Sequence, residues 1–97
     1  MARAPLSTYR LQLSPSFDFD AAAGIVDYLA DLGITHVYLS PILQAAPGST
    51  HGYDVVDPSR PSEELGGIEG YARLTAAISA AGLKQVLDIV PNHMAIT

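Results

Sequence analysis

Residues 86–93 read Val-Leu-Asp-Ile-Val-Pro-Asn-His, and this stretch is the most informative about the fold. Its first five residues have the length and β-branched content of a buried strand, and Pro91, which cannot donate a backbone hydrogen bond, predicts the strand's end. Asp88, Asn92 and His93 are therefore expected at the carboxyl end of a strand. In parallel α/β folds ligands bind at that end, because the loops vary while the strands hold them in place.

The amino-terminal part of the chain predicts a strand, a helix and a second strand. Residues 8–13 alternate apolar with polar side chains, which suits a short strand. Asp18 or Asp20 caps a helix that ends at Gly33, and residues 35–39 form the next strand. The apolar face of this helix has three-and-four spacing and consists of Ala22, Ile25, Val26, Leu29 and Leu32.

The middle of the chain predicts one long loop and a second helix. Residues 40–66 are rich in Pro, Gly, Ser and Asp, and loops of that length in compact domains tend to be functional. A helix is expected at 67–81, and Gly82 ends it as Gly33 ends the first. The expected buried face of this second helix consists of Tyr71, Leu74, Ile78 and Ala81.

Strict alternation of strands and helices indicates a parallel sheet. An open doubly wound sheet usually has a glycine-rich turn after its first strand, but residues 14–17 read Ser-Pro-Ser-Phe, so the (β/α)₈ barrel is favoured. A whole barrel needs roughly 250 residues. Residues 1–97 are thus expected to be the incomplete amino-terminal part of a catalytic barrel domain, with its first three strands and two helices. The strands of Val37 and Val86 are expected to have open edges.

Composition limits the classes of partner. The 97 residues are 48% hydrophobic, enough for the core of one modest domain. A net charge of -5 with five scattered basic residues argues against nucleic-acid binding, and the absence of cysteine excludes disulfides and thiolate metal sites. No apolar run is long enough for a signal peptide or a membrane span, so a cytoplasmic location without membrane association is expected.

Residues 49–57 place Tyr53 beside His51 and Asp54 within the long loop. An aromatic ring beside acids and an imidazole suits a sugar site, because pyranose faces stack on aromatic rings while polar groups bind the hydroxyls. A solvated turn with Tyr53 folded onto the core is the alternative. His51, His93 and Asp54 have no diagnostic spacing for a metal. Asp88 either faces the polar rim or is paired structurally, since its apolar neighbours penalise an unpaired charge.

Two motifs resemble the α-amylase family. Residues 88–93 are similar to its first conserved region, an Asp, three residues and Asn-His at the end of the third barrel strand, and residues 51–53 resemble its aromatic motif. Residues 7–13, 38–54 and 64–67 further resemble members that isomerise maltooligosaccharides. The resemblance implies conversion of the reducing-end α-1,4 linkage into an α,α-1,1 linkage, which gives a trehalose end.

The resemblance also implies roles for individual residues. Tyr53 would stack on the sugar ring at the bond-changing subsite, His93 would hydrogen-bond its hydroxyls, and His51 would line the same subsite. Residues expected to orient or fix the rim loops are Asp88, Asn92, Asp54 and Asp57. Asn92 is a calcium ligand in many amylases, but the resemblance implies neither a metal requirement nor a cofactor.

The catalytic carboxylates are expected beyond Thr97, because a retaining glycosyl transfer needs two carboxylates about 5 Å apart and the family carries them on later strands. This chain would then hold part of a maltooligosaccharide subsite and be inactive alone. Two alternatives stay open: a hydrolytic α-amylase or α-glucosidase of the same family, and a non-catalytic carbohydrate-binding piece.

Overall fold

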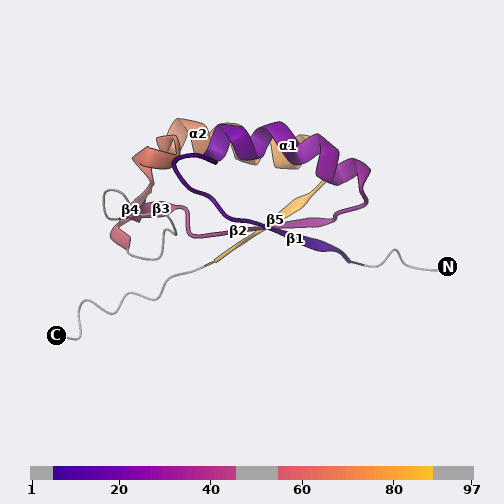
Figure 1. Ribbon diagram of the computed structural model, residues 1–97, viewed down its shortest axis with the longest axis horizontal. Helices are drawn as coiled ribbons and strands as arrows, with labels where there is room; N and C mark the ends of the chain where they lie inside the picture. The colour runs from indigo at the N-terminus through magenta and orange to yellow at the C-terminus, as the bar shows by residue number, and fades with distance from the viewer. Residues whose placement is uncertain (1–5, 46–54, 89–97) are drawn as a thin grey trace.

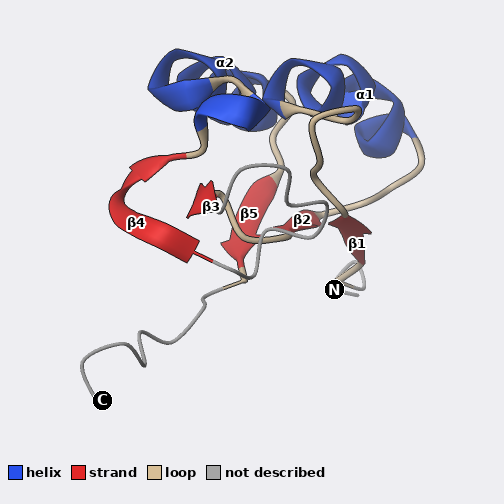
Figure 2. Cartoon of the chain, turned by 60° about the vertical axis from the view of Figure 1, so that its left-hand side comes forward, coloured by secondary structure: helices blue, strands red, loops and turns tan. Residues whose placement is uncertain are grey.

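The computed structural model describes residues 6–45 and 55–88, in which two α-helices cover one face of a three-stranded sheet (Figure 1). In chain order the elements are β1 (Thr8–Leu11), α1 (Phe19–Asp31), β2 (His36–Leu39), β3 (Leu43–Ala45), β4 (Val55–Pro61), the 3₁₀ helix η1 (Glu63–Leu65), α2 (Gly67–Ala80) and β5 (Lys84–Leu87). The opposite face of the sheet carries no helix within these residues, as a view turned by 60° also shows (Figure 2).

The main sheet has the order β1-β2-β5, and both pairings are parallel, which confirms the predicted topology. Its register aligns Arg10 with Tyr38 and Val86 across the three strands. Because β2 pairs on both sides, the expectation of an open edge at Val37 is wrong. The edges of the described sheet are β1 and β5.

Helix α1 begins where its cap was predicted. Asp18 is the cap, and its Oδ1 accepts a hydrogen bond of 2.9 Å from the Ala21 N–H. The prediction that Leu32 lies on the buried face is wrong: this side chain is 57% exposed because it follows the last helical residue as the carboxyl-terminal cap. Ile25 is partly buried against the core. The buried residues of α1 are Phe19, Ala22, Val26 and Leu29.

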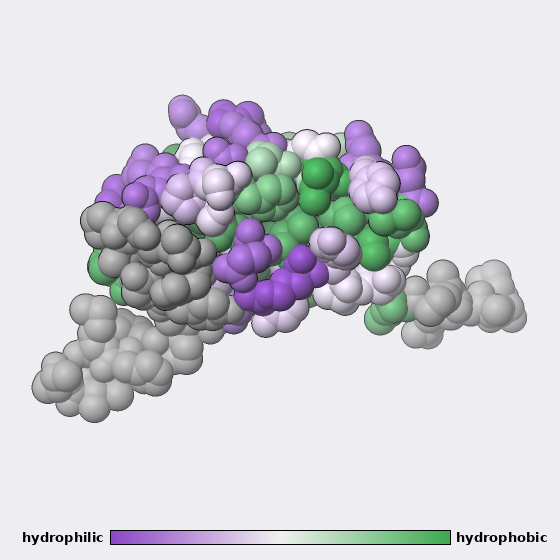
Figure 3. Space-filling model, viewed as in Figure 1, coloured by the Kyte–Doolittle hydropathy of each residue, from purple (hydrophilic) through white to green (hydrophobic). Residues whose placement is uncertain are grey.

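Phe19 joins the two helices. Its side chain is fully buried, and its ring lies 5.5 Å from the ring of Tyr71 in a tilted arrangement. Gly70 lets the Phe19 side chain lie close to the backbone of α2, because a Cβ at position 70 would lie 3.3 Å from Phe19 Cδ2. On the face shown in Figure 3, hydrophilic residues gather over the outer helix surface, apolar residues lie beneath them, and a second hydrophilic patch lies below these.

Helix α2 packs beside α1, and its predicted buried face agrees in part with the observed one. Leu74 and Ile78 are buried, whereas Tyr71 and Ala81 are partly buried and pack against the core. Both helices end in the same kind of turn. Gly33 has φ 89° and Gly82 has φ 79°, a region that favours glycine.

The first and last strands of the parallel sheet have other bounds than predicted, because hydrogen bonding to the neighbouring strand determines where each one begins and ends. The last strand begins at Lys84 because its N–H donates to the Thr35 carbonyl at 3.0 Å, and the register then continues from His36. The first strand ends at Leu11 rather than at residue 13. Residues 89 and 90, the predicted end of the last strand, lie outside the described residues.

The expectation of a single long loop at 40–66 is wrong. Strands β3 and β4 form an antiparallel pair that aligns Gln44 with Asp57, with a register shift on each side of this position, and η1 follows. Sequence patterns miss this pair because β3 has only three residues and the proline Pro61 in β4 normally argues against a strand.

Candidate functional site

The three parallel strands finish at the same end of the sheet. Leu11, Leu39 and Leu87 are aligned there as the last residues of β1, β2 and β5. Asp88 follows directly, and its N–H donates to the Leu39 carbonyl at 3.0 Å. We call this end of the sheet, where the strands have their carboxyl ends, the rim; it is the part of a parallel α/β fold where ligands bind.

Of the residues predicted for the site, the structure describes Asp88 and Asp57. The others, Tyr53, His51, Asp54, Asn92 and His93, lie outside the described residues. In the sequence they follow β3 or β5, and their roles stay predictions.

Asp88 is both at the rim and paired. Its Oδ2 lies 3.6 Å from Nη1 of Arg10, with the Asp88 side chain 19% exposed and the Arg10 side chain 41% exposed. The guanidinium lies 5.2 Å from the ring centroid of Tyr38, and Nη2 donates to Gln12 Oε1 at 3.2 Å. The two options left open for Asp88 from the sequence are therefore realised together, although the sequence did not single out Arg10.

Ser40 fastens the ends of β1 and β2. Its side chain is 0% exposed; its N–H donates to the Leu11 carbonyl at 3.0 Å, and its Oγ accepts from the Leu13 N–H at 2.7 Å. The hydroxyl therefore replaces a backbone carbonyl where the parallel ladder ends. Sequence reasoning missed this residue; a serine between a predicted strand and Pro41 is a signal that could have indicated it.

Gln44 fixes the β3–β4 pair beside the rim. The side chain is buried; its Oε1 accepts from the Glu63 N–H at 2.7 Å, and its Nε2 donates to the Ala45 carbonyl at 2.9 Å. The Ser62 N–H donates to the Ile42 carbonyl at 2.8 Å and closes the same unit. These bonds tie the segment that follows β2 to the start of α2.

Asp57 makes short-range contacts on β4. Its Oδ1 accepts from the N–H and the hydroxyl of Ser59 at 3.0 and 2.5 Å, and Arg60 Nε lies 3.0 Å from Oδ2. The hydrogen bonds from Ser59, aided by the nearby guanidinium, hold the pKa of Asp57 below its usual value. The carboxylate thus bonds to neighbouring residues of β4, and its expected role in fixing a rim loop stays a prediction.

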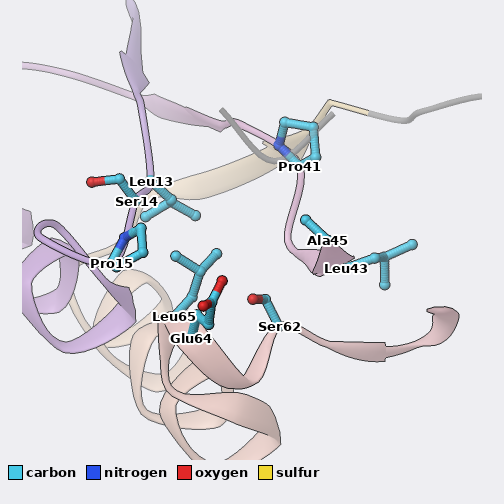
Figure 4. Close-up of a pocket in the computed structure, with 9 residues that line it drawn as sticks. All are labelled: Leu13, Ser14, Pro15, Pro41, Leu43, Ala45, Ser62, Glu64 and Leu65. Atoms are coloured by element: carbon cyan, nitrogen blue, oxygen red, sulfur yellow. The ribbon is translucent and has the colours of Figure 1, made fainter. Parts of the chain in front are cut away.

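A small hollow of about 10 Å³, room for about one water molecule, lies beside the rim (Figure 4). Its walls come from the segments that follow β1 and β2 and from the start of η1, and consist of Leu13, Ser14, Pro15, Pro41, Leu43, Ala45, Ser62, Glu64 and Leu65. Leucine and proline side chains form most of this wall, with the hydroxyl of Ser62 and the carboxylate of Glu64 among them. Within the described residues this hollow is too small by itself to enclose a ligand.

Within 6–45 and 55–88 there is no group of three or more His, Cys, Asp or Glu side chains placed to hold a metal ion. Neither helix in this part of the chain is long and apolar enough to cross a membrane.

Comparison with known proteins identifies the family. Residues 18–97 match the model of the alpha amylase catalytic domain. The chain belongs to the α-amylase family. The alternation of β1, α1, β2, α2 and β5 is accordingly the opening of that family's (β/α)₈ barrel, which confirms the predicted fold class.

Individual α-amylase family members agree over most of this chain. A putative maltooligosyl trehalose synthase from Mycobacterium tuberculosis is 50% identical over 99% of the chain. The solved structure of maltooligosyltrehalose synthase from Arthrobacter ramosus is 54% identical over 92% of the chain, with a TM-score of 0.88. A salivary alpha-glucosidase from Anopheles gambiae is 41% identical over 78%. The chain spans only 12 to 13% of the length of each of these relatives.

Proposed function

We propose that residues 1–97 form the amino-terminal part of the catalytic barrel of a (1→4)-α-D-glucan 1-α-D-glucosylmutase, a maltooligosyltrehalose synthase. The observation that carries this proposal is identity of 50% or more with proteins of that name across 92 to 99% of the chain. The substrate is then a maltooligosaccharide. Its reducing-end α-1,4 linkage becomes an α,α-1,1 linkage.

The residues of this chain supply part of the sugar subsite in the proposal. Tyr53 stacks on the ring at the bond-changing position, while His93 and His51 bind its hydroxyls and line the pocket. Asp88, whose pairing with Arg10 supports an orienting role, holds the rim together with Asn92 and Asp54. No Asp or Glu in the chain is assigned as nucleophile or acid/base.

The proposed reaction requires that water be excluded. A retaining transfer forms a covalent glycosyl intermediate, after which the freed glucose turns over and its anomeric hydroxyl attacks. Because water competes for the same intermediate, the pocket must stay closed around the freed glucose. The buried anchors Ser40 and Gln44, which fix the segments around the rim, are consistent with this need for a rigid wall.

Incubation with maltopentaose tests the proposal. The product of the complete coding sequence and the isolated 97-residue chain are assayed separately, and reducing and non-reducing products are resolved. Loss of reducing ends without shortening, from the complete product alone, is the expected result. Shortened reducing products would instead identify a hydrolase, and activity of the 97 residues alone would refute the assignment of the catalytic carboxylates to later strands.

A hydrolytic α-glucosidase is the second candidate, favoured by the 41% identity with the Anopheles gambiae enzyme. The same assay separates the two, since hydrolysis releases glucose and shortens the oligosaccharide.

The proposal also places the protein in the cytoplasm, without nucleic-acid or membrane partners. Cell fractionation tests that location.

A further inference from the structure

Arg10 crosses the face of the sheet that the helices leave open. It is aligned with Tyr38 and Val86 in the register, whereas Asp88 lies two residues beyond Val86, just past the end of β5. The guanidinium extends over the Tyr38 ring to Oδ2 of Asp88, a diagonal that spans all three strands. Gln12 accepts from the same guanidinium at 3.2 Å. One side chain therefore contacts residues from β2 and from the segments after β1 and β5.

We propose that Arg10 is a positioning residue that sets the direction of the Asp88 carboxylate at the carboxyl end of β5. This inference rests on the function proposed above, in which Asp88 is an orienting residue of the sugar subsite. Arginine suits the task because its planar guanidinium stacks on an aromatic ring while its N–H groups reach a carboxylate. A lysine at the same position keeps the charge but loses the planar guanidinium that contacts Tyr38, Gln12 and Asp88 together.

Stability alone is a poor explanation for this contact. Ion pairs with an exposed partner contribute little to folding, and the 3.6 Å separation of Arg10 and Asp88 is longer than the 2.8 Å of Arg73 and Asp20 on the outer helix surface. The two pairs differ in place: the Asp88 side chain is 19% exposed at the rim, whereas the side chains of Arg73 and Asp20 are 57% and 55% exposed. Arg73 therefore offers a matched control.

The test uses the product of the complete coding sequence, with Arg10→Met, Arg10→Lys, Asp88→Asn and the double variant Arg10→Met/Asp88→Asn. Arg10→Met is expected to lower kcat/KM for maltopentaose by about 10- to 100-fold, since a misplacement near 1 Å at a binding group has effects of this size. It should also raise the ratio of released glucose to trehalose-ended product, because a loosely held sugar admits water. Arg10→Lys should fall between wild type and Arg10→Met.

The double variant tests whether Arg10 acts through Asp88, and Arg73→Met is the control. If Arg10 acts through Asp88, the double variant is no worse than the more impaired single variant. Arg73→Met should leave kcat, KM and the product ratio unchanged. A change of product ratio is decisive here, because loss of folded protein lowers the amount of active enzyme without altering the partition between products.

Several results would overturn the inference. Arg10→Met with wild-type kcat/KM and product ratio excludes a positioning role, and so does an activity loss that only parallels a loss of folded protein. Should Arg10→Met fail to fold, Arg10→Lys decides by the same product ratio. If the wild type hydrolyses maltopentaose, the proposed function is wrong, and the positioning role is then judged by whether Arg10→Lys lowers kcat of hydrolysis while Arg73→Met does not.

Discussion

The hydroxyl of Ser40 supplies the last hydrogen bond between the ends of β1 and β2, inside the core. Ser40→Ala leaves the Leu13 N–H without that acceptor, and an unsatisfied buried donor costs about 1–3 kcal/mol. We expect a loss of that size in the free energy of unfolding, measured by urea denaturation. Ser16→Ala, at an exposed hydroxyl, is the control and should change stability by less than about 0.5 kcal/mol. Equal effects from the two variants would show that the Ser40 bond is unimportant.

At the same scale, the sequence predicts single residues well where the signal is local. Asp18 as helix cap and the two terminal glycines, Gly33 and Gly82, follow from preferences of short segments. Arg10 and Ser40 do not, because their partners become neighbours only once parallel strands are in register. The alternation of apolar and polar residues at 8–13 places Arg10 and Leu11 on opposite faces of the strand. It cannot indicate that Asp88 is the partner of Arg10.

Between elements, α1 and α2 are linked by Asp20 and Arg73, whose N–H groups donate to the carboxylate at 2.8 and 3.0 Å. These bonds lower the pKa of Asp20 from its ordinary 3.8. A lowered pKa in the folded state means that the contribution to stability is complete above the ordinary pKa and is lost as the pH falls through the folded value. Asp20→Asn should therefore slightly lower the melting temperature at pH 7 and have a shrinking effect below pH 3.8.

Asp27→Asn is the matched control for that variant, because Asp27 is exposed two turns further along α1. Its melting temperature should follow wild type across the same pH range. An Asp20→Asn effect that stays constant down to low pH would contradict the electrostatic explanation.

Gly24 of α1 and Gly70 of α2 have different neighbours. A Cβ at Gly24 meets no atom within 4 Å, whereas at Gly70 it lies 3.3 and 3.4 Å from Phe19 atoms. Gly24→Ala should raise the free energy of unfolding by about 0.5–1 kcal/mol, because alanine loses less backbone entropy. Gly70→Ala should be less favourable than Gly24→Ala, since Phe19 must shift. Chemical denaturation of both variants checks this, and equal gains would argue against close packing at Phe19.

Element scale is also where prediction from sequence was least successful. Both long helices and the order of the parallel strands follow from hydrophobic spacing and terminal glycines. The β3–β4 pair does not, because its stability depends on Gln44 and Ser62 bonding across the pair and to η1 rather than on strand-forming residues. Tyr53, His51 and Asp54 belong to the segment between these strands, so their geometry could not be inferred from a loop assignment.

For the molecule as a whole, the edges of the described sheet decide how the chain behaves in isolation. Strands β1 and β5 each pair on one side within the described residues, and open strand edges favour association. Apolar side chains are also exposed nearby, among them Tyr9 on β1 and Val86 on β5. We expect the isolated 97-residue chain to be poorly stable and to self-associate in sedimentation velocity. A monomer with a cooperative thermal transition would contradict this.

The parallel register has a kinetic consequence. Pairing of β1 with β2 brings Thr8 to His36, and pairing of β2 with β5 brings His36 to Lys84. The chain segment closed into a loop by the second pairing is less than twice as long as the segment closed by the first. Closing it costs at most about 0.6 kcal/mol more entropy than closing the first. The unit of β1, α1 and β2 should therefore form first during folding. Asp88 reaches Arg10 only when β5 docks, so the rim should be the last part of this sheet to assemble.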